Sequence, residues 1–217
     1  MKKAVPLRVF SAVPRVLAPP ALTAVRAVVF LLALVPLAAL ILRGAVGALG
    51  ANPVEGILRS LGTWTLVLLL VTLAVTPLRW LTGWTWLARL RRMLGLFAFS
   101  YACLHLTAFV WLDHWFDWPE IFADVLKRPY LSFGFAAFVL MLPLAATSTD
   151  AMVRRLGGRQ WQRLHRVVYL VAGLGVLHFW YHKLAKNDLS QPMIYAAVLG
   201  LLLGVRVLRA VALRIRA

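Results

Sequence analysis

The side chains best suited to chemistry in this sequence are its five histidines. Three of them, His105, His165 and His178, fall inside long apolar segments, whereas His114 and His182 fall at or beyond the ends of such segments. An ionisable side chain within an apolar, bilayer-length segment is costly, so it usually faces the interior of a helical bundle and serves a function. His105, His165 and His178 are therefore candidate functional residues, and interfacial structural roles are expected for His114 and His182.

Composition places these histidines in a membrane protein. Of the 217 residues, 62% are hydrophobic and 14% are charged, and the mean hydropathy is +0.82. These values exclude a water-soluble globular enzyme. The formal net charge of +17 would suggest nucleic acid in a soluble protein, but here it indicates membrane topology and contact with anionic lipid headgroups. Membrane lipids are therefore expected partners, and nucleic acid is not.

Six apolar segments are each close to the roughly 20 residues that cross a bilayer. They predict an all-α, six-helix transmembrane bundle, and no stretch outside them is long enough for a second folded domain. Pro36 and Pro143 lie inside two of the segments, where neighbouring helices can satisfy the freed backbone groups. The segments comprise residues 25–42, 57–76, 93–112, 129–146, 162–180 and 193–208.

The charges separate across these six segments. Most of the 24 Lys and Arg residues lie in the N-terminal tail, the second and fourth connections and the C-terminal tail, where Arg206 is counted. All acidic residues except Asp150 lie on the opposite side. Because positive loops stay in the cytoplasm, both termini are predicted to be cytoplasmic. The expected organisation is a cytoplasmic basic tail (1–24), a transmembrane domain (25–208) and a second basic tail (209–217), in a multi-pass protein of the bacterial inner membrane.

Depth in the membrane pairs two of the histidines. His105 lies 13 or 14 residues after Arg92 and Arg91, roughly 20 Å along a helix, and His178 lies 12 to 15 residues after Arg166 and Arg163. Both segments run from the inside to the outside, so the two imidazoles are expected at similar depth in the outer half. Two such imidazoles can supply both axial ligands of a b-type haem without covalent attachment.

His165 is predicted to lie at the cytoplasmic depth, level with Arg91 and Arg92. It is 13 residues from His178, so the two point about 140° apart on an ideal helix. A bend between them is one way to change that angle, with Gly173 and Gly175 as candidate positions. A zinc site is the alternative metal centre, but it would need three or four ligands close together, which the depth of His165 disfavours.

Four arginines gather at the cytoplasmic depth and predict an anion site. Arg91, Arg92, Arg163 and Arg166 could make charge-assisted contacts to a phosphate, such as that of FMN, or to haem propionates. The alternative interpretation is that these residues act only as topology signals. On the outer side, the acids at positions 113, 117, 120 and 124 gather in one connection and predict a docking surface for a partner with a basic patch.

Several stretches resemble the MsrQ (YedZ) family, the haem-binding membrane subunits of bacterial periplasmic methionine sulfoxide reductase systems. The resemblance covers the chain from the second segment onward and is most specific around His165. It is carried by residues 74–79 (AVTPLR), 91–96 (RRMLGL), 147–149 (TST) and 161–169 (WQRLHRVVY), together with His105, His165 and His178.

This resemblance implies a ferric-reductase-like transmembrane domain that holds b-haem and an FMN. It further implies that quinone supplies electrons and that a periplasmic molybdopterin-containing methionine sulfoxide reductase receives them, for the repair of oxidised proteins. Members of the wider superfamily have a further histidine one span-length before the first in the third helix, whereas Arg91 occupies that position here. A guanidinium cannot ligate iron. One haem through His105 and His178 is therefore expected, and a second through His165 is left open.

A proton-coupled membrane transporter is the alternative function, in which the buried histidines would relay protons. A transporter of this kind should show inverted repeats or matched broken helices, and the sequence shows neither. A purely structural membrane anchor is a further alternative, but it would leave the buried histidines unexplained. The sequence therefore favours a haem-containing electron-transfer subunit.

Overall fold

The computed structural model describes residues 16–184 and 187–215, and in these ranges the only regular elements are helices. Within the same ranges, six spans are long and apolar enough to cross a membrane, which confirms the predicted all-α bundle. The predictions for residues 1–15, most of the N-terminal tail, lie outside the described part of the chain. The six spans are Pro19–Ala45, Pro53–Thr82, Thr85–Asp113, Pro129–Ala146, Gly158–Leu184 and Ser190–Ile215.

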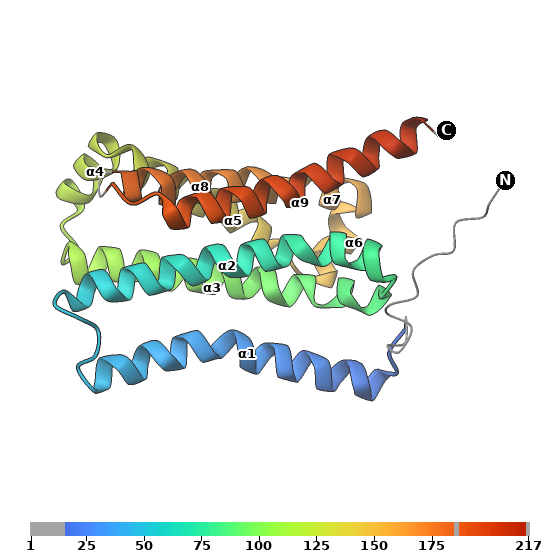
Figure 1. The fold of residues 1–217 in the computed structure, drawn as a ribbon, viewed down its shortest axis with the longest axis horizontal. Coiled ribbons are helices and arrows are strands. Elements are labelled where there is room, and N and C mark those ends of the chain that lie inside the picture. The colour runs from blue at the N-terminus through green and yellow to red at the C-terminus, as the bar shows by residue number, and fades with distance from the viewer. Residues whose placement is uncertain (1–15, 185–186, 216–217) are drawn as a thin grey trace.

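Four spans are single helices and two are composite. The single helices are α1 (Pro19–Ala45), α2 (Pro53–Thr82), α5 (Pro129–Ala146) and α9 (Ser190–Ile215). The third span joins the 3₁₀ helix η1 (Thr85–Arg89), α3 (Arg91–Ala108) and the π-helix η2 (Phe109–Asp113), and the fifth joins α7 (Gly158–His165) to α8 (Val168–Leu184). Two short helices, α4 (Trp118–Lys127) and α6 (Asp150–Leu156), lie at opposite ends of the bundle (Figure 1).

The fifth span breaks at a position that the sequence did not predict. The run of α-helical hydrogen bonds is interrupted at Arg166 and Val167, directly after His165, whereas α8 continues without a break through Gly173 and Gly175. The candidate bend positions Gly173 and Gly175 thus lie inside a continuous helix, and the interruption of the span falls next to His165 instead. His165 and His178 therefore sit on separate helices, and the angle calculated for one ideal helix does not relate them.

Helix starts are marked by local side-chain caps. The side chains of Asn52, Asp117 and Thr149 accept hydrogen bonds from backbone N–H groups three residues further on, at the starts of α2, α4 and α6. Such caps satisfy donors that have no partner within the helix. At the other end of α2, Gly83 adopts the left-handed conformation (φ 76°) that ends many helices.

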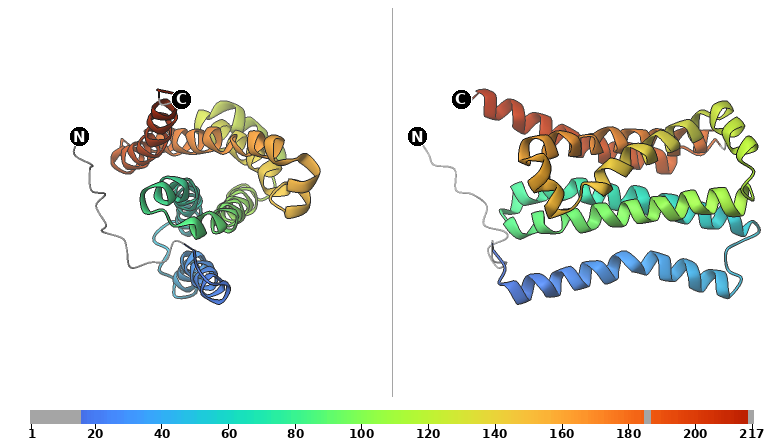
Figure 2. Two further views of the ribbon diagram at one scale, coloured as in Figure 1. Left: turned by 90° about the vertical axis from the view of Figure 1, so that its right-hand side faces the viewer. Right: turned by 180° about the vertical axis from the view of Figure 1, so that it is seen from behind.

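The bundle is built from two packed helix pairs and an outlying first helix. Helix α2 lies along α3, and α5 lies along α8, while α9 covers α2 and α8 (Figure 2). Helix α2 has buried leucines around much of its circumference because α1, α3, α8 and α9 contact it, whereas Trp64, Val71 and Leu78 form an exposed stripe. Helix α1 lies at the edge of the bundle, and most of its large apolar side chains are exposed. Those side chains face the surface that lipid would cover.

A buried tyrosine attaches α1 to the rest of the bundle. The Tyr101 hydroxyl on α3 donates to the Ala33 carbonyl (2.8 Å) and accepts from the Leu37 N–H (3.1 Å). These two backbone groups are one helical turn apart and pair directly in a regular helix. Pro36, which has no N–H, lies between them and accounts for the bend of α1 (Figure 1). The tyrosine therefore bonds α1 at the place where the proline weakens the hydrogen bonding within that helix.

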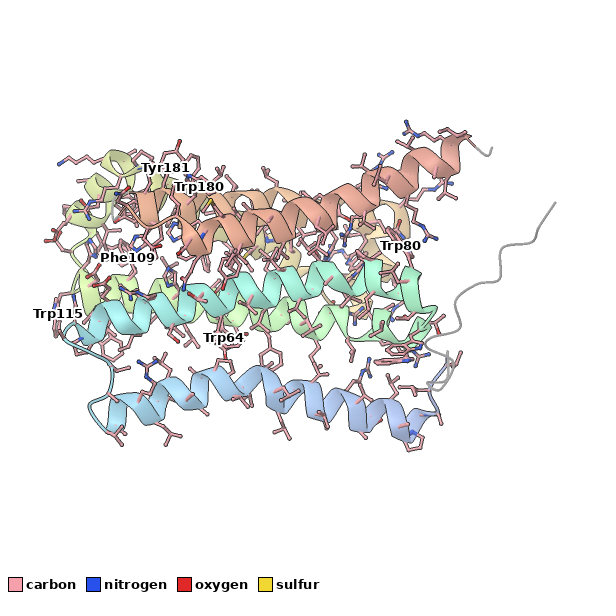
Figure 3. The ribbon with its side chains drawn as sticks, in the orientation of Figure 1. Trp64, Trp80, Phe109, Trp115, Trp180 and Tyr181 are labelled. Carbon is pink, nitrogen blue, oxygen red and sulfur yellow. The ribbon has the colours of Figure 1, made fainter. Side chains whose placement is uncertain are left out.

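The two ends of the bundle differ in charge. The end that carries α6, α7 and the arginines 89, 91 and 92 is called here the basic end, and the end that carries α4 is called the acidic end. Helix α1 starts, and α9 finishes, at the basic end (Figure 1). Trp80 lies toward the basic end and Trp115 at the acidic end, as expected of aromatic residues at two membrane interfaces, whereas Trp64 lies between them (Figure 3).

We expect Tyr101→Phe to destabilise the protein by about 1–2 kcal/mol, because two buried backbone groups of α1 lose a partner. The free energy of unfolding in mixed detergent micelles measures this loss. Tyr181→Phe is the matched control, because that side chain is 42% exposed and packs only its ring against Phe133. Equal stability of the Tyr101 and Tyr181 variants would contradict the role given to the hydroxyl.

Candidate functional site

Two histidines face each other between the helix pairs. The rings of His105 on α3 and His178 on α8 have centroids 6.2 Å apart and planes inclined at 80°. A metal ion about 2 Å from a nitrogen of each imidazole, with each ring centre roughly 1 Å behind its nitrogen, places the two centroids about 6 Å apart. The observed separation therefore suits two ligands on opposite sides of one metal ion.

A backbone carbonyl lies within hydrogen-bond distance of one nitrogen of each ring. Nδ1 of His105 lies 3.0 Å from the Leu58 carbonyl on α2, and Nδ1 of His178 lies 2.6 Å from the Tyr130 carbonyl on α5. A carbonyl oxygen only accepts, so each Nδ1 must carry a hydrogen and donate it. In the neutral imidazole this leaves the Nε2 lone pair available as a ligand, the usual arrangement of metal-binding histidines.

This donor set fits a b-type haem better than a protein-only metal centre. Within the described residues, no group of three or more His, Cys, Asp or Glu side chains could hold a metal ion. A structural or catalytic zinc ion needs three or four protein ligands. A haem needs only axial ligands from the protein, and two neutral imidazoles supply them. His105 and His178 would be the residues that hold it.

A second candidate site is a cavity of about 430 Å³ at the basic end. It lies between α2, α3, α5, α7, α8 and α9, and its wall combines apolar side chains with hydroxyls, arginines and one histidine. The polar lining residues are Thr72, Thr76, Arg91, Arg92, Ser148, Gln162, His165, Arg166, Tyr169 and Arg206.

His165 is held in the wall of this cavity by two neighbours. Its Nε2 lies 3.1 Å from Oγ1 of Thr147, and its ring stacks on Trp161 at 3.9 Å. Trp161 in turn donates from Nε1 to the Thr147 carbonyl (2.8 Å). Because the Thr147 hydroxyl donates to the Pro143 carbonyl (2.6 Å), it accepts from Nε2 of His165. The ring nitrogen that would most readily ligate a metal is thus already engaged, unlike those of His105 and His178.

The structure brings together three of the four arginines predicted to form an anion site. Arg91, Arg92 and Arg166 line the cavity, whereas Arg163 is exposed and is not a lining residue. Arg92 also bonds Asp150 (2.7 Å), and the Arg92 guanidinium holds the pKa of that exposed carboxyl below its ordinary value. Arg91 and Arg166 form no salt bridge with the acids of the described chain.

Arg206 is a lining residue that the count of basic residues grouped with the C-terminal tail, although the predicted segment 193–208 contains it. Helix α9 continues to Ile215, so Arg206 lies inside the sixth span and points into the bundle. It donates to the Leu202 carbonyl (2.5 Å) and to the Leu73 carbonyl of α2, and it lies over the Tyr169 ring at 5.6 Å. An arginine at this depth is itself a signal of function, and counting it as a tail residue concealed that signal.

Pro77 explains why Arg206 reaches α2. Residue 77 would normally donate its N–H to the Leu73 carbonyl, one turn earlier, but proline has no N–H. The Arg206 guanidinium supplies the missing donor. Its Nε is buried and has no hydrogen-bond partner in the described part of the chain. Arg206 therefore joins α9 to α2 and also adds an uncompensated positive charge to the cavity wall.

At the acidic end, three of the four clustered acids have contacts inside the protein. Asp117 caps α4, Asp124 lies 3.3 Å from Arg128, and Asp113 and Asp124 each lie 3.5 Å from a ring nitrogen of the buried His114. Asp113, Asp117 and Glu120 are nevertheless exposed. These three acids lie at the same end of the bundle as the exposed aromatic side chains of Trp115, Phe116, Trp118 and Phe122.

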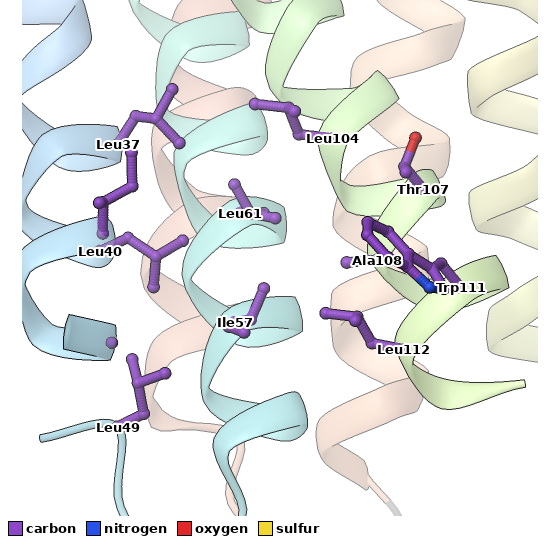
Figure 4. Close-up of a pocket in the computed structure, with 12 residues that line it drawn as sticks. Leu37, Leu40, Leu49, Ile57, Leu61, Leu104, Thr107, Ala108, Trp111 and Leu112 are labelled. Carbon is purple, nitrogen blue, oxygen red and sulfur yellow. The ribbon is translucent and has the colours of Figure 1, made fainter. Parts of the chain in front are cut away.

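An apolar cavity of about 290 Å³ lies between α1, α2 and α3 near the acidic end (Figure 4). Leucines from all three helices line it, with Thr107 and Trp111 of the third span. It contains none of the predicted site residues and no ionisable side chain, so it adds nothing to the chemistry of the histidine pair.

Comparison with known proteins agrees with this architecture. Residues 61–176 match the family described as ferric reductase like transmembrane component, a range that contains His105 and ends two residues before His178. Proteins named protein-methionine-sulfoxide reductase heme-binding subunit MsrQ are 56% identical over 189 residues in Herminiimonas arsenicoxydans and 58% identical over 194 residues in Ralstonia nicotianae. The matches cover 87% and 89%, respectively, of both this chain and the relative. No solved structure matches the chain significantly.

The fold and the matched family define a multi-pass membrane protein with a ferric-reductase-like transmembrane domain. A further relative with the MsrQ name, from Rhodospirillum rubrum, is 54% identical over 186 residues, which cover 86% of this chain and 88% of that protein. The chain belongs to the MsrQ family.

A double-mutant cycle tests the bond between Arg206 and α2. We expect Arg206→Met to lower the free energy of unfolding by about 1–3 kcal/mol, because the buried Leu73 carbonyl loses its donor. In the Pro77→Ala background the loss should be smaller, because the introduced alanine would supply the helical N–H. Arg209→Met is the control on the same helix, since Arg209 lies over Trp80 at 4.4 Å. Additive effects of the Arg206 and Pro77 substitutions would refute the coupling.

Proposed function

We propose that the protein is a b-haem electron-transfer subunit, in which His105 and His178 would hold the haem iron. The observation that carries this proposal is the 6.2 Å separation of two imidazoles, each with its Nδ1 bonded to a carbonyl. The names of the relatives, which describe heme-binding subunits, support it. The group would supply reversible one-electron chemistry at this position. The two histidines hold it, and their helix partners set the orientation of the rings.

We propose further that electrons pass from a quinol to a periplasmic methionine sulfoxide reductase that contains molybdopterin, for the repair of oxidised proteins. In this arrangement the protein lies in the bacterial inner membrane with its basic end in the cytoplasm, in accordance with the positive-inside rule. The histidine pair then lies toward the periplasmic side, close to α4 and its exposed acids. A small, charge-steered encounter at that surface is sufficient for electron transfer to a soluble partner.

The cavity at the basic end is proposed as the site of FMN. Arg91, Arg166 and Arg206 give its wall an excess of positive charge, which suits a phosphate. Trp161 and Tyr169 add aromatic faces to the same wall, which suit a planar ring system. Since Nε2 of His165 is bonded to Thr147, we assign this histidine to the cavity wall and propose a single haem.

The haem assignment predicts that His105→Ala and His178→Ala each abolish haem binding, because both axial positions need an imidazole. Haem and iron per polypeptide, together with a reduced-minus-oxidised spectrum, measure the outcome, and quinol-dependent haem reduction should be lost in parallel. His182→Ala is the matched control, since it lies one helical turn further along α8 and contacts the Tyr130 ring. Full haem content in either the His105 or the His178 variant would overturn the assignment.

The FMN assignment predicts weaker flavin binding when charge is removed from the cavity wall. In the double variant Arg91→Gln/Arg166→Gln, flavin affinity should fall about tenfold or more, because each hydrogen bond to a charged group contributes roughly 1.5–3 kcal/mol. Arg163→Gln removes a nearby charge that lies outside the cavity, so it should leave affinity unchanged. Flavin titration of the purified protein measures both. The proposal fails if the double variant and the control bind FMN equally.

A further inference from the structure

Each facing histidine packs against a glycine of the neighbouring helix. A Cβ atom added to Gly62 on α2 would lie 3.1 Å from Cε1 and 3.3 Å from Nδ1 of His105. A Cβ atom added to Gly134 on α5 would lie 2.7 Å from Nδ1 and 3.0 Å from Cε1 of His178. The ring atoms thus occupy the space that a side chain would fill at either position.

The two glycines have the same sequence spacing from the residues whose carbonyls accept hydrogen bonds from the histidines. Gly62 is four residues after Leu58, and Gly134 is four residues after Tyr130. In a helix, the Cα–Cβ bond leans toward the N-terminus, so the side chain of a residue lies over the carbonyl four positions earlier. Glycine at that position leaves the second lone pair of the carbonyl open to a donor from another helix. The arrangement occurs once in each helix pair.

Backbone conformation does not require glycine at either position. Both residues lie within regular helices, and the described glycines with positive φ are Gly47, Gly50, Gly83 and Gly157. Glycine inside a helix is less favourable than alanine by about 1 kcal/mol. Without a contact to the imidazoles, Gly→Ala at these sites would therefore be expected to stabilise the helices. The close approach of the rings is the feature that opposes alanine.

We propose that Gly62 and Gly134 are positioning residues for the haem ligands. Each glycine leaves a helix carbonyl accessible to one imidazole and leaves space for the ring of that imidazole. This inference rests on the proposed ligation by His105 and His178. The two positions differ in how much space they leave for a side chain. Alanine at position 134 requires the His178 ring to move, whereas alanine at position 62 requires His105 to shift by a few tenths of an ångström. Gly134 is therefore the stricter of the two.

The test compares haem binding by Gly134→Ala, Gly62→Ala and Gly173→Ala. Disturbing the outer partner of a metal-ligating histidine typically costs 10–100-fold in affinity, so Gly134→Ala should lose haem affinity by roughly that factor. Gly62→Ala should lose less, and its low-temperature electron paramagnetic resonance spectrum should show shifted g-values. Gly173→Ala on α8 is the control, because nothing lies within 4 Å of its added Cβ. Unchanged affinity and spectrum in Gly134→Ala would overturn the proposal.

Rescue by free imidazole distinguishes a positioning role of Gly134 from misfolding of the variant. In a His178→Gly background, added imidazole should restore the haem spectrum, because the free ring supplies the missing ligand. It should do so with or without Gly134→Ala, since an untethered ring can shift away from the new methyl group. Failure of rescue only when Gly134→Ala is present would indicate misfolding and count against the proposal. Retention of full haem by His178→Ala would instead refute the ligation itself, whatever the glycine variants do.

Discussion

The structure depends on one constraint: in lipid, a helix backbone group without a partner inside its own helix must find one in another helix. Side chains supply such a partner near two of the prolines that interrupt helices. Tyr101 bonds the backbone of α1 around Pro36, and Arg206 bonds the Leu73 carbonyl that Pro77 leaves without a donor. Hydrogen bonds of this kind are directional, so they fix how helices lie against each other in a way that apolar packing in lipid does not.

The candidate haem ligands use the same type of bond. His105 donates to a carbonyl of α2 and His178 donates to a carbonyl of α5, so each imidazole is held within its own helix pair. One consequence is electronic, because the bond fixes the tautomer and leaves Nε2 free. The other is mechanical, because the distance between the rings depends on how the two pairs pack against each other. The ligand geometry is thus a property of the whole bundle.

Charged side chains also differ in whether they find a partner inside the protein. At the acidic end, Asp124 is paired with Arg128, and Asp117 is used as a helix cap. At the basic end, Asp150 pairs with Arg92, while Arg91, Arg166 and Arg206 face a cavity and form no salt bridge with an acid among the described residues. An excess of guanidinium charge in a partly enclosed space is unfavourable unless an anion occupies it. The topology signal read from the sequence and the proposed anion site therefore involve some of the same residues.

The sequence alone determined the class of protein, the six spans and the pairing of His105 with His178. These features follow from composition, segment length and depth along a helix, which are all local or one-dimensional quantities. The sequence could not place the break after His165, because neither Arg166 nor Val167 is a residue type that usually interrupts a helix. It also assigned Arg206 to a tail and Arg163 to a site, because depth does not reveal which face of a helix meets its neighbours.

Only the tertiary structure decided which backbone groups the side chains bond. The carbonyls of Leu58, Tyr130 and Leu73 look the same in a sequence as every other carbonyl, and their importance arises from a second helix lying against them. Gly62 and Gly134 acquire their meaning in the same way, through rings that approach from α3 and α8. The sequence determined which residues carry the chemistry, while the packing of helices decided the orientation of those residues, because hydrogen-bond geometry between helices depends on contacts that are distant along the chain.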